Sequence, residues 1–401
     1  MIDFDTAFQR MMQHAQTLGT EQIPLSEAVG RILAQPVRAD IDLPPFNRAA
    51  MDGFACHRAD LALPLRQVGT VGAGMCHEAA LQRGECVRIM TGAPLPEQAD
   101  CVFMLEESAL DSAAQVRFTG KNSPDNFVPQ GDDLRQGDLL LSPGERLQAA
   151  HLASLAAVGL SHPTVFIRPQ VAIITTGDEL VGIDQRPRGA QIRNSNAPQL
   201  FAQVAAAGGV PKDFGHVGDA LPAIRERVAE ATRTHDVVLL SGGVSMGDFD
   251  YGREALEACG YQFSFDRVAM QPGKPTLFGF KSGLPQGNRW CFGLPGNPVS
   301  TFMVFERMVK PFLYGLMGHI YQPRLISAQL GAGLKRKKVD REAAFPVRFT
   351  DPSTVTPLSY HGSAHINALM TADAFITLPQ GCAGYAEGDR VTVQLFDPLC
   401  G

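Results

Sequence analysis

Four short loops between residues 171 and 300 bring glycine together with hydroxyl, amide and charged side chains. They cover residues 175–180, 241–248, 271–275 and 294–300. Three of them directly follow an apolar run typical of a strand, and the loop at 271–275 follows the mixed run 261–269. Such loops at strand ends of an α/β sheet present backbone N–H groups to an anion. The series predicts a site for a phosphorylated or anionic ligand.

Glycine dominates the loop that follows the apolar run 237–240. Gly242 and Gly243 lack a Cβ, so a phosphate can approach their backbone closely, and Ser245 adds a hydroxyl. A plain tight turn at the end of a strand is the alternative. In the loop at 295–298, Asn297 can cap a helix and Pro298 suits its first position. Capping alone would explain Asn297, but not the two prolines, Pro295 and Pro298, that flank Gly-Asn.

Carboxylates accumulate in the same loops. Acidic groups beside an anion repel it unless a cation lies between them, which predicts Mg²⁺ bridging carboxylates and phosphate oxygens. Separate, solvated loop charges are the alternative. Lys274 is the cation of these loops and suits a point-charge contact with an oxyanion. The acidic residues concerned are Asp178, Glu179, Asp219, Asp248 and Asp250.

Alternating strand and helix patterns must position these loops. They predict a central doubly wound α/β domain with right-handed crossovers over residues 169–320. The expected strands are 171–175, 210–217 and 237–240, with further strands around Phe278 and 291–292. The expected helices are 197–207, 221–233, 251–259 and 297–316.

The flanking sequence divides into three further regions. Residues 1–46 and 135–168 predict a helical linker domain with helices at 4–18, 26–34 and 145–158, the last ended by Gly159. Residues 47–134 predict a small β-rich module, with strands at 87–90 and 101–105. Residues 321–401 predict a C-terminal β-barrel-like domain with strands at 345–349, 374–378 and 390–396.

Composition excludes several classes of function. A chain of 401 residues predicts several domains, and its net charge of −6 argues against nucleic-acid binding. The basic run 335–338 fits a solvated turn. The eight cysteines have no CxxC spacing and are expected to be reduced core residues. Without a signal-peptide pattern or an apolar segment of membrane length, the chain is expected to be cytoplasmic.

Taken together, the motifs resemble one family, the MoeA/gephyrin family of molybdopterin molybdenumtransferases. The motifs of this family occur in the family's order along nearly the whole chain. The Met-Asp-Gly and Pro-Gly-Asn-Pro motifs are the most specific. On physics alone, Asp52-Gly53 is a plain turn. The matching segments are 50–55, 89–94, 131–133, 176–180, 192–196, 241–245, 272–275 and 294–300.

The resemblance implies an enzyme that takes adenylylated molybdopterin and molybdate, releases AMP with Mg²⁺, and leaves molybdenum on the dithiolene. It also implies an elongated homodimer whose site lies between the α/β domain of one subunit and the small module of the other. The catalytic residues would be Asp52, Thr91, Asp132, Asp133, Glu179, Asp219 and Asp250, with Asp219 and Asp250 as Mg²⁺ ligands. The substrate-binding residues would be Gly242, Gly243, Ser245, Gln271, Lys274, Pro275, Pro295, Asn297, Pro298, Ser300, Arg341 and Ser363.

The chain departs from the family pattern at two places. Gln271 stands where many relatives have lysine, so molybdate would be held with one charge fewer. The segment 126–130 lacks the arginines of some bacterial relatives. Two other functions stay open: adenylyl transfer from ATP to molybdopterin, and a gephyrin-like scaffold. A molybdopterin adenylyltransferase and molybdoenzyme maturation factors would be the partners.

Overall fold

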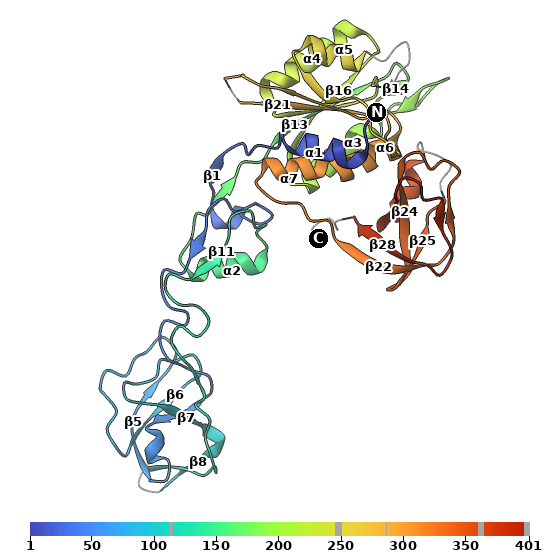
Figure 1. Cartoon of the computed structure of the whole chain (residues 1–401). Coiled ribbons are helices and arrows are strands. Elements are labelled where there is room, and N and C mark those ends of the chain that lie inside the picture. The colour runs from blue at the N-terminus through green and yellow to red at the C-terminus, as the bar shows by residue number, and fades with distance from the viewer. Residues whose placement is uncertain (112–114, 245–250, 286, 360–364, 397–401) are drawn as a thin grey trace.

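The computed structural model describes residues 1–111, 115–244, 251–285, 287–359 and 365–396 of the chain. The molecule is elongated (Figure 1). A small β module lies at one end, and the α/β domain and a C-terminal β domain lie together at the other. Between them runs a narrow region formed by β1 (Thr20–Gln22), β12 (Thr164–Phe166), β2 (Val37–Arg38), β11 (Leu139–Leu141) and α2 (Ala149–Ala157).

The central domain is built on a six-stranded sheet in the order β16-β13-β17-β21-β20-β18. The first four strands are parallel, and β20 and β18 run antiparallel to their neighbours. The sheet is therefore mixed, whereas the alternation of strands and helices predicted a parallel sheet. The bounds are β13 (Gln170–Thr176), β16 (Val210–Val217), β17 (Val237–Ser241), β18 (Gln262–Phe265), β20 (Leu277–Lys281) and β21 (Arg289–Leu294).

Helices cover both faces of this sheet (Figure 1). Along β13, Val171 and Ile173 pack in the core on one face, while Ala172 and Ile174 pack in the core on the other. A strand buried on both faces needs this uninterrupted apolar run. The doubly wound arrangement is confirmed. On one face lie α1 (Phe4–Met12), α3 (Asn196–Ala206), α6 (Pro298–Val304) and α7 (Lys310–Leu316), and on the other α4 (Leu221–Thr234) and α5 (Gly252–Ala258).

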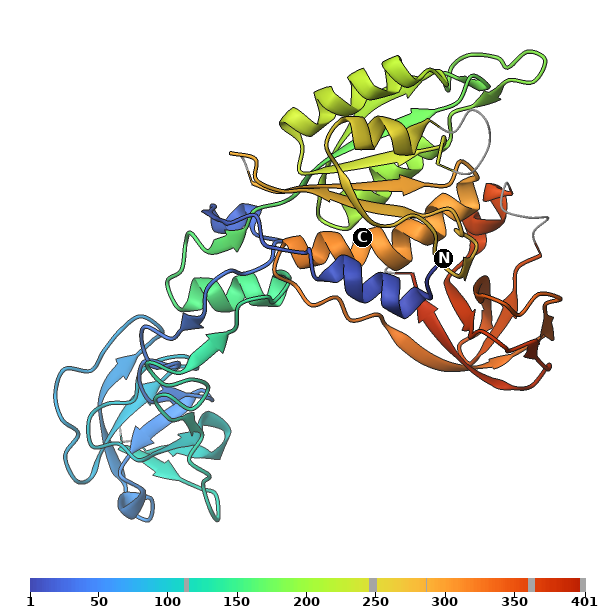
Figure 2. The same ribbon diagram turned by 45° about the horizontal axis from the view of Figure 1, so that its top comes forward.

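The long helix expected at 297–316 is interrupted by one π-helical turn, η4 (Phe305–Val309), between α6 and α7. Figure 2 shows α1 lying alongside α7. The N-terminus also joins this region through its backbone, because Ile2 N donates to Arg267 O at 3.2 Å and Ala269 N donates to Ile2 O at 2.7 Å.

The helix expected at 26–34 is wrong. A single 3₁₀ turn, η1 (Leu25–Glu27), forms there, and Gly30 then takes a φ of +76° that ends any helical path. Leu33 instead bridges Val165 and packs in the core of the narrow region. The helix expected at 145–158 begins later, at Ala149, and Gly159 follows it with a φ of +73°.

The small module contains a six-stranded sheet in the order β7-β4-β6-β5-β9-β8. Cys56, Cys86 and Cys101 are buried in it as expected, whereas Cys76 is exposed. The bounds are β4 (Gly53–Cys56), β5 (Leu65–Val71), β6 (Glu85–Ile89), β7 (Cys101–Met104), β8 (Ser108–Leu110) and β9 (Gln115–Phe118). Short 3₁₀ turns lie at η2 (Arg58–Asp60) and η3 (Leu105–Glu107).

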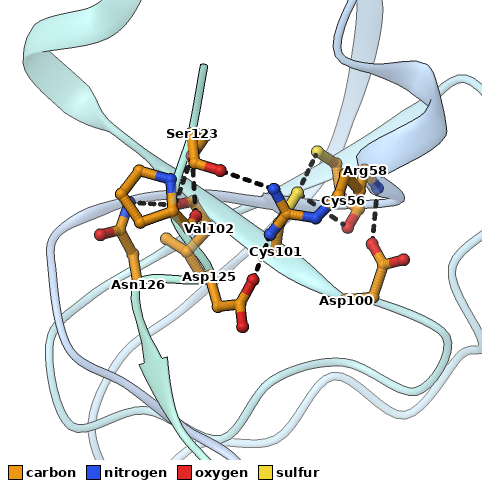
Figure 3. A network of polar contacts seen from close by, with 9 residues as sticks. Cys56, Arg58, Asp100, Cys101, Val102, Ser123, Asp125 and Asn126 are labelled. Carbon is orange, nitrogen blue, oxygen red and sulfur yellow. Dashed lines mark hydrogen bonds and ion pairs between the residues drawn. The ribbon is translucent and has the colours of Figure 1, made fainter.

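A polar network fastens the segment 123–126 to this sheet (Figure 3). Arg58 donates to Ser123 O and to the carboxylate of Asp125, each at 2.5 Å, and Asn126 Nδ2 donates to Val102 O at 2.7 Å. The chain then continues as β10 (Phe127–Val128), which pairs with β3 (Arg48–Ala49). The network and the pairing of β10 with β3 therefore hold the two ends of the module together.

The C-terminal domain is a closed barrel. Its strands lie side by side in the order β24-β25-β22-β28-β26, and β26 also pairs with β24, which closes the barrel. A sixth strand, β19 (Met270–Gln271), comes from the α/β domain and pairs with β24. The bounds are β22 (Leu325–Leu330), β24 (Glu342–Asp351), β25 (Thr354–Pro357), β26 (Ala374–Leu378) and β28 (Arg390–Leu395), with a hairpin of β23 (Leu334–Lys335) and β27 (Gly384–Tyr385) and the 3₁₀ helix η5 (Ile366–Thr371). Across the described ranges, no helix has the length and apolar character needed to cross a membrane.

Candidate functional site

A cavity of about 650 Å³ opens at the carboxyl end of the parallel strands. It lies between the neighbouring strands β13 and β17. After β13 the chain turns to the side of β16, and after β17 it turns to the opposite side, that of β21. Such a switch point is where open α/β sheets bind ligands. The described residues that line it are Thr175, Thr176, Gly177, Glu179, Leu180, Ile192, Arg193, Asn194, Ser195, Asn196, Asp219, Ser241, Gly242, Gly243, Val244, Pro275, Pro295, Gly296, Asn297, Pro298 and Ile366.

The glycines of the β17 loop are required by their neighbour Thr176. Gly242 and Gly243 have φ values of +96° and +61°. A Cβ on Gly242 would lie 2.4 Å from Thr176 O, and one on Gly243 would lie 2.8 Å from Thr176 Oγ1. The tight turn is therefore present, and its backbone also lines the cavity, while anion binding by this loop stays a prediction. The buried hydroxyl of Thr176 has no hydrogen-bond partner among the residues that the structure describes.

Two asparagines hold the loops of the cavity together. Asn196 Nδ2 donates to Ser241 Oγ at 2.9 Å and to Gly296 O at 2.7 Å, so it joins α3 to the loops after β17 and β21. Asn194 Nδ2 donates to Thr175 Oγ1 at 2.8 Å, and Asn194 Oδ1 accepts from Ala197 N at 3.2 Å. These asparagines belong to the segment 192–196, whose role the sequence did not specify.

The acidic loops cap one another. Asp178 N donates to Asp219 Oδ2 at 3.3 Å, and Asp219 N donates to Asp178 Oδ1 at 3.0 Å. Glu179 and Asp219 both line the cavity. Arg193 carries the positive charge among the described lining residues, and its Nε donates to Gln185 O at 2.9 Å. The described residues contain no group of three or more His, Cys, Asp or Glu arranged to hold a metal ion.

The loop after β21 is fixed from below by Thr301. Thr301 Oγ1 donates to Pro295 O at 2.5 Å and to Asn297 O at 3.1 Å. Asn297 occupies the N-cap position of α6, with Pro298 next as expected, but its side chain makes no capping hydrogen bond. The expectation that Asn297 caps the helix is therefore wrong. Its amide is exposed at the cavity instead, while Ser300 is buried in the helix.

The loop at 271–275 is not a strand-end loop of the parallel sheet. It follows β19, which pairs with Glu342 and Ala343 of the C-terminal barrel. Gln271 and Lys274 are exposed, and Pro275 borders the cavity, so the two halves of the proposed site adjoin there. Arg341 lies next to Glu342, with its side chain 20% exposed and its Nε 3.5 Å from Asp340.

In the small module, Asp52 and Thr91 form one unit. Asp52 Oδ1 accepts hydrogen bonds from Thr91 N and from Thr91 Oγ1, both at 2.7 Å. These two bonds hold the pKa of the Asp52 carboxyl below its ordinary value, so it stays ionised. The carboxylate is exposed, and the neighbouring Met51 side chain is exposed as well.

Asp132 and Asp133 follow β10 along the same module. Asp133 N donates to Leu43 O at 2.9 Å, and Gln130 N donates to Asn47 Oδ1 at 2.9 Å, which holds this segment beside the start of the module. Within one chain, however, the module lies far from the cavity (Figure 1). The structure thus gathers the expected residues into two groups. Ser245, Asp248, Asp250 and Ser363 lie outside the described residues.

The fold and the cavity define an α/β domain with a ligand site at the switch point of its sheet, extended by a small module and a barrel. The chain matches the probable molybdopterin binding domain over residues 172–315, the MoeA N-terminal region (domain I and II) over residues 2–159 and the MoeA C-terminal region (domain IV) over residues 327–396. The chain belongs to the MoeA family of molybdopterin molybdenumtransferases.

Relatives support this over nearly the full length. The molybdopterin molybdenumtransferase of Staphylococcus epidermidis is 33% identical over 416 residues, covering 99% of this chain and 96% of that protein. That of Bacillus subtilis is 32% identical over 417 residues, covering 98% and 94%. The solved MoeA protein of Pyrococcus horikoshii superposes with a TM-score of 0.85 at 25% identity, covering 99% of this chain and 100% of that one.

Proposed function

We propose that this chain inserts molybdate into adenylylated molybdopterin and releases AMP. The observation that carries the proposal is the cavity at the β13–β17 switch point, which combines glycine backbone, asparagine amides, one arginine and two carboxylates. Backbone N–H groups and Arg193 suit phosphate oxygens, and the exposed Asn297 amide suits a base or sugar. Family membership supports the reaction.

The acidic wall of the cavity is the proposed Mg²⁺ side. Mg²⁺ in proteins is held by one or two carboxylates together with substrate phosphates, so a cluster of three acidic side chains is not required. Asp219 at the cavity fits one such ligand, and Asp250, outside the described residues, would be the second. When bound, the ion neutralises charge on the phosphate oxygens. Glu179 lies on the same wall.

The loop at 271–275, with Ser300, Arg341 and Ser363, is the proposed molybdate side. A tetrahedral dianion needs cations and N–H or O–H donors, which Lys274, Arg341 and the Gln271 amide provide. Because Pro275 borders the nucleotide cavity, molybdate held by this loop would lie next to the bond that is broken. Ser300 is buried in α6, so its hydroxyl would have to contact the anion from inside that helix.

The module residues require a second copy of the chain. Asp52 and Thr91 are exposed, and the module that carries them lies at the end of the molecule opposite the α/β domain (Figure 1). We propose a homodimer in which the module of one subunit faces the cavity of the other. The low pKa of Asp52 then supplies a permanent carboxylate to the shared site. The buried thiols of Cys56 and Cys101 form a hydrogen bond of 3.5 Å and no disulfide, which fits a reducing cytoplasm. Upstream adenylyltransferases and maturation factors would be transient partners.

An AMP-release assay tests the reaction. Purified protein with adenylylated molybdopterin, Mg²⁺ and molybdate should release AMP, and omission of any one should stop it. Asp219→Asn should slow release about a hundredfold or more, since one preorganised charge contact is lost. Glu254→Gln, on an exposed position of α5, is the matched control and should behave as wild type. Formation of adenylylated molybdopterin from ATP, without molybdate-dependent AMP release, would favour an adenylyltransferase instead.

A further inference from the structure

A buried arginine lies in the π-helical turn between α6 and α7, beneath the loop at 271–275. The Arg307 side chain is 7% exposed, and it forms an ion pair with Glu342 at the start of β24. Its guanidinium carbon also lies 4.0 Å from the centre of the Phe4 ring. Single π-helical turns are rare and occur frequently at functional sites. Arg307 therefore links three parts of the chain: the N-terminal helix, the α/β domain and the C-terminal barrel.

Glu342 is the essential partner of this arginine. Burial lowers the pKa of Arg307, and Glu342 opposes that shift. Among the described residues, Nη1 of Arg307 has no hydrogen-bond partner, so the compensation for burying the charge comes from Glu342, the carboxylate of Asp5 and the Phe4 ring. A buried charge of this kind tolerates the loss of its partner poorly. The position of Glu342 is thus strongly fixed relative to η4.

Through its backbone, Glu342 also fixes the position of the loop at 271–275. Glu342 pairs with Met270 of β19, and Glu342 N donates to Ala269 O at 3.0 Å. The loop begins one residue after Met270 and folds back, because Val268 N donates to Lys274 O at 3.1 Å.

The helix that carries Arg307 also touches the loop from below. Gly273 has a φ of +106°, and a Cβ there would lie 2.4 Å from Val304 Cγ2. Val304 is the residue directly before η4. The loop at 271–275 is therefore held between β24 on one side and the start of the π-helical turn on the other.

The Arg307–Glu342 ion pair also fixes the position of Arg341. Arg341 directly precedes Glu342, and its backbone oxygen accepts a hydrogen bond from Arg336 Nη1 at 2.6 Å. The backbone from which its side chain extends is therefore held directly beside Glu342 and the ion pair. In this way one buried pair sets the relative position of Arg341 and Lys274, which come from different domains.

We propose that the Arg307–Glu342 pair is the positioning element of the molybdate side, which keeps Arg341 of the barrel and Lys274 of the α/β domain at the spacing that a tetrahedral dianion requires. The inference rests on the proposed function. Neither Arg307 nor Glu342 lines the cavity at the β13–β17 switch point. Disturbing the pair should therefore weaken molybdate binding selectively.

Two conservative substitutions and one matched control test this. Glu342→Gln removes the charge and keeps an acceptor, and Arg307→Lys keeps the charge and removes the fork. The control is Arg289→Lys, in the buried pair of Arg289 and Asp236 at the start of β21 in the α/β sheet, where the separation is 3.5 Å and the side chains are 7% and 18% exposed. The control should share any loss of thermal stability without touching the site.

The measurements are steady-state AMP release at varied molybdate and, separately, at varied adenylylated molybdopterin. Both test variants should raise the KM for molybdate about tenfold, equivalent to ~1.4 kcal/mol, with KM for the pterin substrate and kcat at saturating molybdate within about twofold of wild type. Arg289→Lys should leave all three constants unchanged. An unchanged molybdate KM in both test variants, or an equal rise in the control, would overturn the inference. If wild type itself released no AMP in response to molybdate, the proposed function would fail instead, so the two failures are distinguishable.

Discussion

Asp52 accepts two hydrogen bonds from Thr91, one from its backbone nitrogen and one from its hydroxyl, and both measure 2.7 Å. The pair joins the start of β4 to the loop after β6, so it is built into the frame of the module. Although exposed, this carboxylate is held in one orientation and kept ionised by its donors. We propose that it forms one half of a site whose other half is the cavity of the α/β domain.

The first prediction concerns the titration of Asp52. Thr91→Val removes the hydroxyl donor and keeps the backbone donor, so the pKa of Asp52 should rise towards its ordinary value of about 3.9. Because the folded-state pKa lies below the unfolded value, the pair stabilises the fold above that unfolded pKa, and this contribution is lost as pH falls through the folded pKa. Carboxyl carbon NMR of Asp52 measures the shift, and Thr91→Ser should retain the wild-type titration.

The second prediction concerns the glycine loop. Gly242→Ala places a Cβ 2.4 Å from Thr176 O at a φ of +96°. We expect a loss of about 1–3 kcal/mol in the free energy of unfolding, measured by urea denaturation. Gly296→Ala is the control for stability, because a Cβ there would lie 3.8 Å from its nearest neighbour. Equal stability of the two variants would contradict the account of this loop.

The third prediction concerns the amide that ties the cavity loops together. Asn196→Asp removes the donor to Gly296 O and places a carboxylate oxygen near that carbonyl. We expect AMP binding, measured by calorimetry, to weaken by about 1–3 kcal/mol, because the lost donor leaves buried acceptors unsatisfied. Asn288→Asp, at a partly buried asparagine just before the other end of β21, should bind AMP as wild type does.

The fourth prediction concerns the charge of the molybdate side. Gln271→Lys adds a cation to an exposed loop position and should tighten molybdate binding by up to about 1 kcal/mol at low salt. The gain should shrink as ionic strength rises, because exposed charges are screened. Lys274→Ala should change affinity in the opposite direction. Equilibrium dialysis with molybdate at two salt concentrations decides, and an affinity for molybdate that neither substitution alters would place the anion elsewhere.

The sequence predicted the α/β domain well because buried strands and amphipathic helices leave clear patterns. The strand at 210–217 has the predicted bounds, and the helix at 221–233 is longer by one residue. Prediction failed where tertiary contacts decide. Leu33 follows a helical pattern but bridges Val165 instead, and β19 leaves its own domain to pair with β24. No local pattern reports pairing between strands so far apart in the chain.

The site was predictable in part for a related reason. Glycines and carboxylates of the loops are visible in the sequence, and the cavity gathers Glu179, Asp219, Gly242 and Asn297. Asn194 and Asn196 act by joining loops, so their importance appears only once those loops meet. The helix-start pattern of Asn297 suggested a cap, yet its side chain makes no capping bond. The orphaned Thr176 hydroxyl likewise has no signal in the sequence.

The central claim is that each site is divided between two chains, and mixed variants test it most directly. Asp52→Asn and Asp219→Asn should each slow AMP release about a hundredfold or more on their own. In a dimer with one subunit of each kind, purified through two different tags, one site carries both substitutions and the other carries neither. The account predicts that this mixed dimer regains about half of the wild-type rate of molybdate-dependent AMP release. A mixed dimer as inactive as its two parents would contradict it, because the module would then serve the cavity of its own chain.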